Sequence, residues 1–266
     1  NNKEEFIEKL VFWAKKYTHS CFLNSNKKRL RMPKNYTKYD FLFGVGAHKI
    51  FNPDNNSFQK LKVFYKRNKD WMFGYFSYDL KNEIENLSSN NVDNLFFPPL
   101  FFFIPEIVFS MQAEILYVDT FSDKKETEYI INQITNQHID KEYFKGLKIQ
   151  KRESEAEYLE KIKQIKTHIN RGDIYEINYC QEFFSENITI NPEILFFRLN
   201  RKIGAPFSAF FHLGDKYLIC SSPERFLRKE NQQLLSQPIK GTRKRSSKKK
   251  IDLQLQMDLL NSEKDK

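Results

Sequence analysis

Apolar residues recur at two spacings along this chain, and the two spacings predict helices interspersed with short strands. In residues 5–17 and 124–136 the apolar positions fall three and four apart, which is the spacing of one helical face. Residues 154–171 repeat that spacing, with Tyr158, Ile162 and Ile165 on one side. Short apolar runs between polar or turn residues predict strands at 21–23, 42–47, 49–51, 71–80, 95–109 and 207–213.

The ends of several elements also carry specific signals. Ser154 is followed three residues later by Glu157, which is the pattern of a capping box, and Gly172 is placed to end that helix. Asn191 and Pro192 predict the start of another helix, with Leu195, Phe196 and Leu199 on its buried side. Residues 173–184 alternate between large and polar side chains, which predicts a strand.

A carboxylate and a lysine flank a predicted hairpin near the C-terminal end. Residues 218–221 form an apolar run short enough for a buried strand, and Ser222-Pro223 interrupts it. Residues 226–228 and 234–236 predict two strands around a polar turn at 230–233. Such a hairpin would return Glu224 and Lys240 to the same end of a sheet.

The neighbours of these two side chains suggest acid and nucleophile chemistry. Lys240 lies close in sequence to Arg243, Lys244 and Arg245, and crowding of positive charge disfavours a protonated amine. A partly buried Glu224 would stay protonated, as a general acid must. The alternative is a surface lysine beside a surface glutamate, since charged side chains are mostly exposed.

Composition limits the remaining possibilities. The chain has 266 residues and a net charge of +10, and the run 243–250 supplies six of the positive charges. The run contains no aromatic residue for stacking on bases, so we expect a solvated loop and no nucleic-acid partner. Three scattered cysteines, the charged first residues and the proline-broken run 95–109 favour a cytoplasmic protein without disulfides, signal peptide or membrane span.

Three motifs in order resemble the chorismate-binding enzymes. They are Gly-Asp-Ile-Tyr-Glu-Ile-Asn at 172–178, Ser-Pro-Glu-Arg-Phe at 222–226 and Pro-Ile-Lys-Gly-Thr at 238–242. The family includes anthranilate, isochorismate and aminodeoxychorismate synthases. The lysine of the third motif is similar to the aminodeoxychorismate synthase branch, whereas anthranilate synthases have alanine there.

The resemblance implies a reaction and a set of site residues. Lys240 would be a nucleophile toward C2 of chorismate, and Glu224 the general acid for loss of the C4 hydroxyl. Gly241, Thr242 and Ser222 would contact substrate. The product would be 4-amino-4-deoxychorismate for 4-aminobenzoate and folate synthesis, a transferase reaction that uses ammonia from a separate glutamine amidotransferase subunit.

The resemblance also implies a fold and a cofactor. The fold would be α+β, with mostly antiparallel sheets layered with helices as in anthranilate synthase component I. Residues 1–145 would form the N-terminal region, and 146–266 the first half of the catalytic domain. Mg²⁺ would be used, but its ligands would lie beyond Lys266, so no metal ligand is assigned in this chain and the chain alone would be inactive.

The family often has an amino-acid pocket that binds tryptophan, beside the N-terminal sheet. Residues at similar positions here are Ser25, Tyr36, Thr37, Lys38, Pro206, Phe207 and Ser208. Two other functions stay open from the sequence alone. One is another chorismate-using enzyme, of the anthranilate or isochorismate synthase type, and the other is a basic nucleic-acid-binding module built on residues 243–250.

Overall fold

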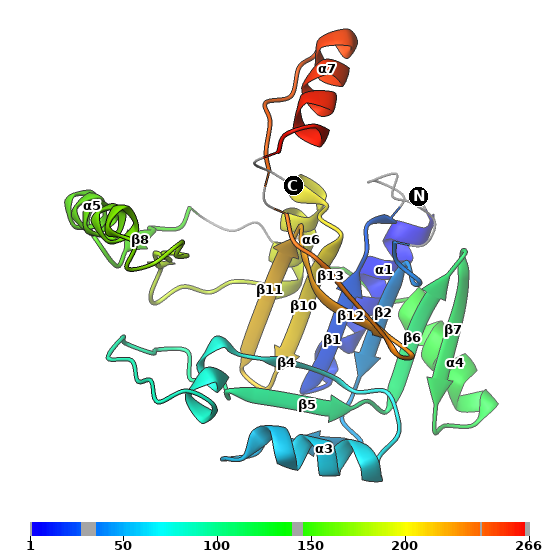
Figure 1. Ribbon diagram of the computed structural model, residues 1–266. Helices are drawn as coiled ribbons and strands as arrows, with labels where there is room; N and C mark the ends of the chain where they lie inside the picture. The colour runs from blue at the N-terminus through cyan, green and yellow to red at the C-terminus, as the bar shows by residue number, and fades with distance from the viewer. Residues whose placement is uncertain (1, 28–35, 140–145, 240, 264–266) are drawn as a thin grey trace. The chain divides into compact units, whose positions relative to one another are not determined.

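A computed structural model describes residues 2–27, 36–139, 146–239 and 241–263, and their fold is α+β (Figure 1). Within this part of the chain the helices are α1 (Asn2–Trp13), α3 (Ser57–Arg67), α4 (Lys124–Thr135), α5 (Glu155–Arg171), α6 (Pro192–Ile203) and α7 (Lys249–Leu260), with 3-10 turns η1 (Ala14–Lys16) and η2 (Tyr78–Glu83). The strands are β1 (His19–Asn24), β2 (Phe41–Val45), β3 (Lys49–Phe51), β4 (Phe73–Phe76), β5 (Leu100–Ile104), β6 (Ile107–Gln112), β7 (Ile115–Thr120), β8 (Gln150–Lys151), β9 (Phe183–Phe184), β10 (Phe207–Leu213), β11 (Lys216–Ser222), β12 (Arg225–Glu230) and β13 (Gln233–Gln237).

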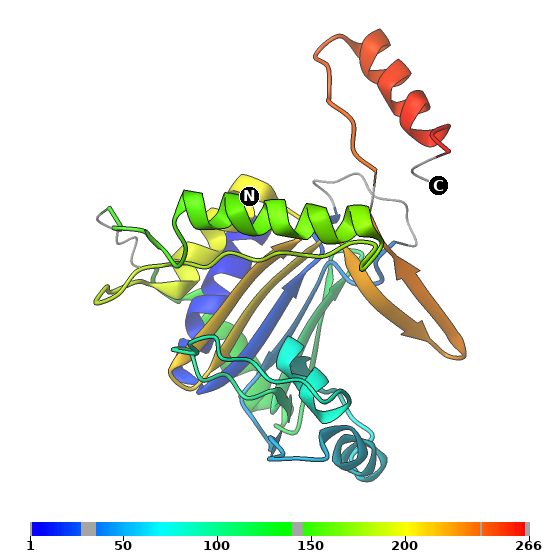
Figure 2. The ribbon, with the colours of Figure 1, turned by 60° about the vertical axis from the view of Figure 1, so that its left-hand side comes forward.

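A six-stranded antiparallel sheet, in the order β11-β10-β1-β2-β6-β7, is the frame of the structure (Figure 2). Its central strand β1 pairs with β10, so that Phe22 lies opposite Phe210 and Cys21 opposite Phe211. A second antiparallel sheet has the order β3-β5-β4. The strands β12 and β13 form a separate hairpin.

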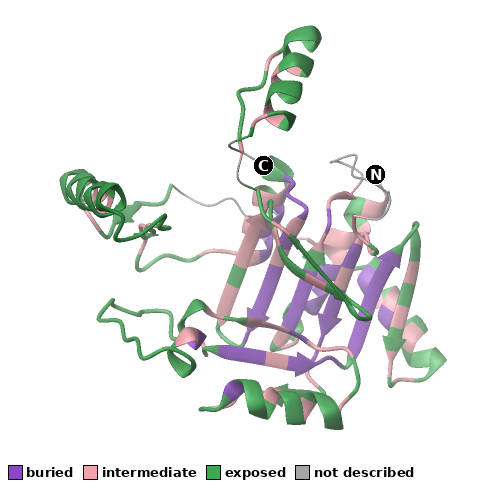
Figure 3. Cartoon of the chain, in the orientation of Figure 1, coloured by how far each residue is buried: buried purple, intermediate pink, exposed green. Residues whose placement is uncertain are grey.

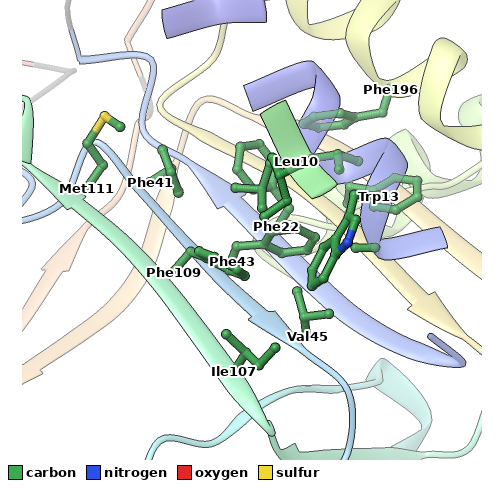
Figure 4. Packing of buried hydrophobic residues seen from close by; sticks show 14 of the residues in the cluster. Leu10, Trp13, Phe22, Phe41, Phe43, Val45, Ile107, Phe109, Met111 and Phe196 are labelled. Carbon is green, nitrogen blue, oxygen red and sulfur yellow. The ribbon is translucent and has the colours of Figure 1, made fainter. Parts of the chain in front are cut away.

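Each face of the six-stranded sheet carries its own hydrophobic cluster, because successive side chains of a strand point to opposite faces. On one face Phe22, Phe43 and Phe109 pack with residues of α1, α4 and α6, as Figure 4 shows for Leu10, Trp13 and Phe196. The other face packs against the three-stranded sheet, and that cluster consists of Cys21, Phe73, Phe101, Phe103, Val108, Phe211 and Leu213. Figure 3 shows that buried residues are concentrated in the sheets.

The local signals at element ends are confirmed. Ser154 Oγ accepts the backbone N–H of Glu157, and a Glu157 carboxylate oxygen accepts the N–H of Ser154. Gly172 ends α5 with a left-handed backbone, φ +82°. At the start of α6, Asn191 Oδ1 accepts the N–H of Ile194 at 3.0 Å. The hairpin β12–β13 also forms around the polar turn that was predicted at 230–233.

The prediction of a strand across residues 173–184 is wrong. Regular pairing is confined to β9, which pairs with β8, and residues 174–182 have no strand structure. Tyr175, one of the large side chains of that pattern, is 91% exposed. Alternation of large and polar residues shows which side chains could share a face of a strand. A strand also needs a neighbouring strand to accept and donate its backbone hydrogen bonds.

Two predictions of burial are also wrong in part. The run 218–221 is a strand, but it lies in β11 at the edge of the sheet and its residues are half-buried or exposed. In α6, Phe196 is buried as predicted, together with Phe197, while Leu195 and Leu199 are only half-buried. Apolar character alone does not distinguish an edge strand from a central one, because burial depends on what covers each face.

The chain forms two compact units, residues 1–139 with 196–266 and residues 140–195. The chain therefore leaves the first unit and returns to it, since β10 and β11 complete the sheet begun by β1 and β2. The division expected from the family at 145/146 stays a prediction. Searched over the part of the chain that is described, no helix has both the length and the apolar character needed to cross a membrane.

Candidate active site

The turn between β11 and β12 places Glu224. Ser222 ends β11, and its hydroxyl oxygen lies 3.3 Å from both the backbone nitrogen and the carbonyl oxygen of Glu224. The Ser222 hydroxyl can thus accept from the first and donate to the second, which is the usual way that serine stabilises a turn. Ser222, predicted to contact substrate, therefore supports the backbone of the candidate acid.

The carboxylate of Glu224 contacts the segment that leaves β13, at the open end of the β12–β13 hairpin. Its Oε1 accepts the backbone N–H of Ile239 at 3.2 Å. Ile239 immediately precedes Lys240 in the chain, and Lys240 itself lies outside the described residues. The predicted return of the hairpin is confirmed as far as Ile239.

The surroundings of Glu224 differ from the expectation. The residue is exposed, so the partial burial that was expected to keep its carboxyl protonated is not supplied by the described residues. Of the other two predicted substrate contacts, Gly241 is half-buried and Thr242 is exposed. A general acid at this position needs a covering surface, because burial is what disfavours the charged carboxylate.

The basic run is partly neutralised by a neighbouring helix. The guanidinium of Arg245 donates two hydrogen bonds to the carboxylate of Asp252 in α7, at 2.8 and 2.7 Å. The hydrogen bond from Arg245, with one from the backbone N–H of Ser246, lowers the pKa of Asp252 to about 2. Arg245 is therefore committed to an ion pair, which weakens its predicted part in crowding Lys240.

A second site lies beside the hairpin. All seven residues predicted for an amino-acid pocket line one cavity of about 590 Å³: Ser25, Tyr36, Thr37, Lys38, Pro206, Phe207 and Ser208. The hydroxyls of Ser25 and Ser208 donate to the carbonyl oxygens of Asp40 and Ala205. The Thr37 hydroxyl is buried and has no hydrogen-bond partner among the described residues.

Among the residues of this cavity wall that the sequence interpretation missed, four lie on β12: Arg225, Arg228, Lys229 and Glu230. The guanidinium of Arg225 lies 5.1 Å from the ring centroid of Tyr36 and 4.9 Å from that of Phe207. Partial burial, with a smaller contribution from Arg228, lowers the pKa of Arg225. Its place beside Glu224 in the Ser-Pro-Glu-Arg-Phe motif was the only available signal, because the ring contacts come from distant segments.

No metal site is formed by the residues that the structure covers. Nowhere among them do three His, Cys, Asp or Glu side chains come together in a way that could hold an ion. The expected Mg²⁺ therefore has no set of ligands in this part of the chain, and no chemical step is derived through a metal.

The layered sheets define an α+β protein, and the carboxylate of Glu224 accepts from the residue that precedes Lys240 in the chain. The family model described as "chorismate binding enzyme" matches residues 19–266. The chain belongs to this family.

Two curated relatives match different lengths of the chain. Aminodeoxychorismate synthase component 1 of Salmonella typhimurium is 40% identical over 111 residues, which is 42% of this chain and 24% of that protein. Anthranilate synthase component 1 of Thermus thermophilus is 29% identical over 202 residues, 72% of this chain and 44% of that protein. The matched stretches thus cover less than half of either relative.

The fold has a solved counterpart. Anthranilate synthase component I from Streptococcus pneumoniae superposes with a TM-score of 0.68 at 17% identity, covering 88% of this chain and 59% of that one. At this identity the likeness concerns the fold, and it confirms the predicted anthranilate synthase component I-like architecture.

Proposed function

We propose that the protein containing this chain aminates chorismate at C4 to 4-amino-4-deoxychorismate. The proposal starts from family membership and from the lysine of the Pro-Ile-Lys-Gly-Thr motif. Relatives with the printed name aminodeoxychorismate synthase component 1 match the chain at up to 40% identity. The observation that carries the proposal is the hydrogen bond from the Ile239 N–H to Glu224, because it brings the candidate acid next to the residue before Lys240.

The proposed reaction has two displacement steps. The uncharged amine of Lys240 forms a bond to C2 of chorismate, the ring double bonds shift, and the C4–O bond breaks. Glu224 donates a proton to the departing hydroxyl, which leaves as water. Ammonia then bonds to C4 while the C2–N bond to Lys240 breaks. The balance is chorismate plus ammonia to aminodeoxychorismate plus water.

Two further components are proposed on the family resemblance alone. A glutamine amidotransferase subunit would supply ammonia. Magnesium would be held by residues other than the described ones, and its charge would balance a substrate carboxylate.

The cavity of about 590 Å³ is proposed to bind tryptophan. Aromatic walls at Tyr36 and Phe207 suit an indole ring. Calorimetry of the protein with tryptophan, and of a Phe207→Ala variant, tests this use of the cavity. Heat of binding in the wild type that Phe207→Ala abolishes is expected, and no heat in the wild type would exclude tryptophan.

A second reaction of the same family is supported by the longer match to an anthranilate synthase, which covers 72% of this chain. Its product would be the aromatic anthranilate instead of the C4-aminated ring. The lysine in the loop favours amination at C4, because a nucleophilic side chain is needed only for the covalent route.

Product analysis separates these two reactions. The whole protein would be incubated with chorismate and ammonium, and the products identified by mass spectrometry and fluorescence. We expect aminodeoxychorismate, and we expect Lys240→Ala to abolish or severely slow its formation. Anthranilate as the product, or wild-type turnover by Lys240→Ala, would refute the covalent amination.

A further inference from the structure

The guanidinium of Arg225 joins three segments that are far apart in the chain. Its Nε donates to Oε1 of Gln237 on β13 at 2.8 Å, and a terminal nitrogen donates to the carbonyl oxygen of Tyr36. The same group lies over the rings of Tyr36 and Phe207, within the range of cation–π attraction. The proposed reaction assigns no role to any of these contacts.

The Arg225–Gln237 bond reinforces a weak point of the hairpin. Arg225 lies opposite Gln237 and Arg228 opposite Leu235, but the register shifts between these two pairs. Such a bulge locally disrupts the ladder of backbone hydrogen bonds. The Arg225–Gln237 pair is the one nearest to Glu224 and Ile239. The hydrogen bond between their side chains therefore stabilises the end of the hairpin that carries the candidate acid.

Burial does little to hold this hairpin in place. Phe226 is 90% exposed, and Leu227 and Leu234 are more than half exposed. Side chains with so little packing surface contribute little to fixing the two strands. The contacts of Arg225 with Tyr36 and Phe207 therefore provide a tie between the hairpin and the β10 side of the sheet.

We propose that Arg225 is a positioning residue for the reaction of Glu224 and Lys240. Because Arg225 bonds to Gln237 and to the carbonyl oxygen of Tyr36, it keeps the Glu224 carboxylate within hydrogen-bond distance of the backbone that precedes Lys240. Arg225 is the first residue of β12 and directly follows Glu224, so its contacts act on the candidate acid through the backbone. The catalytic part of this inference rests on the proposed function.

The first test is kinetic and uses the whole protein with chorismate and ammonium. Arg225→Ala should lower kcat by about 10- to 100-fold, the scale of effect for a displacement of about 1 Å at a reacting group, with KM for chorismate little changed. Arg225→Lys keeps the charge but not the forked donor geometry, so it should recover only part of the loss. Gln237→Ala removes one contact and should give a smaller decrease.

Gln233→Ala is the matched control, because Gln233 is an exposed polar residue on the same hairpin, opposite Glu230. We expect wild-type kcat from it. Near-UV circular dichroism gives the folded fraction of each variant, so that kcat is expressed per folded molecule. An Arg225→Ala variant with wild-type kcat, or a loss that Gln233→Ala reproduces, would overturn the positioning role.

A second test does not depend on the reaction. The backbone amide of Ile239, observed by NMR in the same whole protein, should lose the chemical shift of a hydrogen-bonded N–H in Arg225→Ala and keep it in Gln233→Ala. An unchanged Ile239 signal in Arg225→Ala refutes the inference. If the wild type makes no aminated product, the proposed function fails, and the Ile239 signal still decides whether Arg225 positions Glu224.

Discussion

The side chain of Glu224 and the backbone N–H of Ile239 form a 3.2 Å hydrogen bond across 15 positions of sequence. The bond closes the open end of the β12–β13 hairpin at the point where the chain continues to Lys240. The hydrogen bond fixes the position of the Glu224 carboxylate, although the side chain stays exposed. Glu224 therefore has a positional role in the structure that is distinct from its proposed role as an acid.

Glu224→Gln keeps an oxygen that can accept from Ile239 but removes the transferable proton. We expect aminodeoxychorismate formation by the whole protein to fall by about 10²- to 10⁴-fold, the usual contribution of a general acid. Glu85→Gln, at an exposed glutamate in another segment of the chain, is the control and should keep its turnover. Steady-state kinetics with chorismate and ammonium measures both, and a Glu224→Gln variant close to wild type would remove the acid role.

Gly74 in β4 has no room for a side chain. A Cβ there would lie 2.0 Å from the backbone carbonyl oxygen of Phe101 and 2.6 Å from the ring of Phe102. Because a backbone oxygen in a paired strand cannot move aside cheaply, Gly74→Ala should destabilise the fold severely, by more than about 3 kcal/mol. Urea unfolding measures the change.

Gly146→Ala is the matched control for Gly74, since nothing lies within 4 Å of its added Cβ. It should leave the unfolding midpoint nearly unchanged. Equal midpoints for the two alanine variants would show that β4 does not pack on β5 as described.

The capping box at the start of α5 predicts a local effect. Ser154→Ala removes the acceptor for the Glu157 N–H and should cost about 1 kcal/mol of helix stability. Thr167→Ala, on the same helix, replaces a β-branched residue with a better helix former and should have the opposite sign. Hydrogen exchange of the α5 amides reports both, and unchanged exchange in Ser154→Ala would argue against the cap.

The Arg245–Asp252 pair predicts a dependence on pH. The pKa of Asp252 is lowered to about 2 in the folded chain, mainly by the hydrogen bond from Arg245. The pKa of an aspartate in an unfolded chain is about 3.9, so the stabilisation by the Arg245–Asp252 pair is fully present above that pH. The contribution is lost as pH falls from about 4 through about 2.

Titration of the Asp252 carboxyl by NMR measures this pKa directly. In Arg245→Ala the pKa should rise toward the ordinary range, since the largest cause of its lowering is gone. A value that does not move in this variant would mean that the bidentate pair does not form in solution.

Local patterns predicted the elements well where the signal was complete within a few residues. Ser154 with Glu157, Asn191 with Pro192 and the turns of the hairpins each satisfy their own backbone hydrogen bonds. Such signals need no distant partner. The same reasoning failed at residues 173–184, because a strand pattern is realised only where another strand edge is available.

The residues of the candidate site were predictable from the sequence, but their burial and their contacts were not. The seven residues of the proposed amino-acid pocket do share one cavity. The exposure of Glu224 and the contacts of Arg225 were not predictable, because each depends on residues far away in the chain. Burial and ring stacking are properties of the assembled chain and leave no mark in the spacing of neighbouring residues.

The amino-acid sequence by itself determined several of the helices and strands, the family motifs and the identity of the candidate acid and nucleophile, since these depend on residue types at short range. Only the tertiary structure decided that β1 pairs with β10, that β12 lines the cavity, and that Glu224 bonds to Ile239. These relationships join segments separated by up to nearly two hundred positions, as in the contact of Tyr36 with Arg225. Pairing over such distances follows from which faces the packed core leaves available, and no local pattern contains that information.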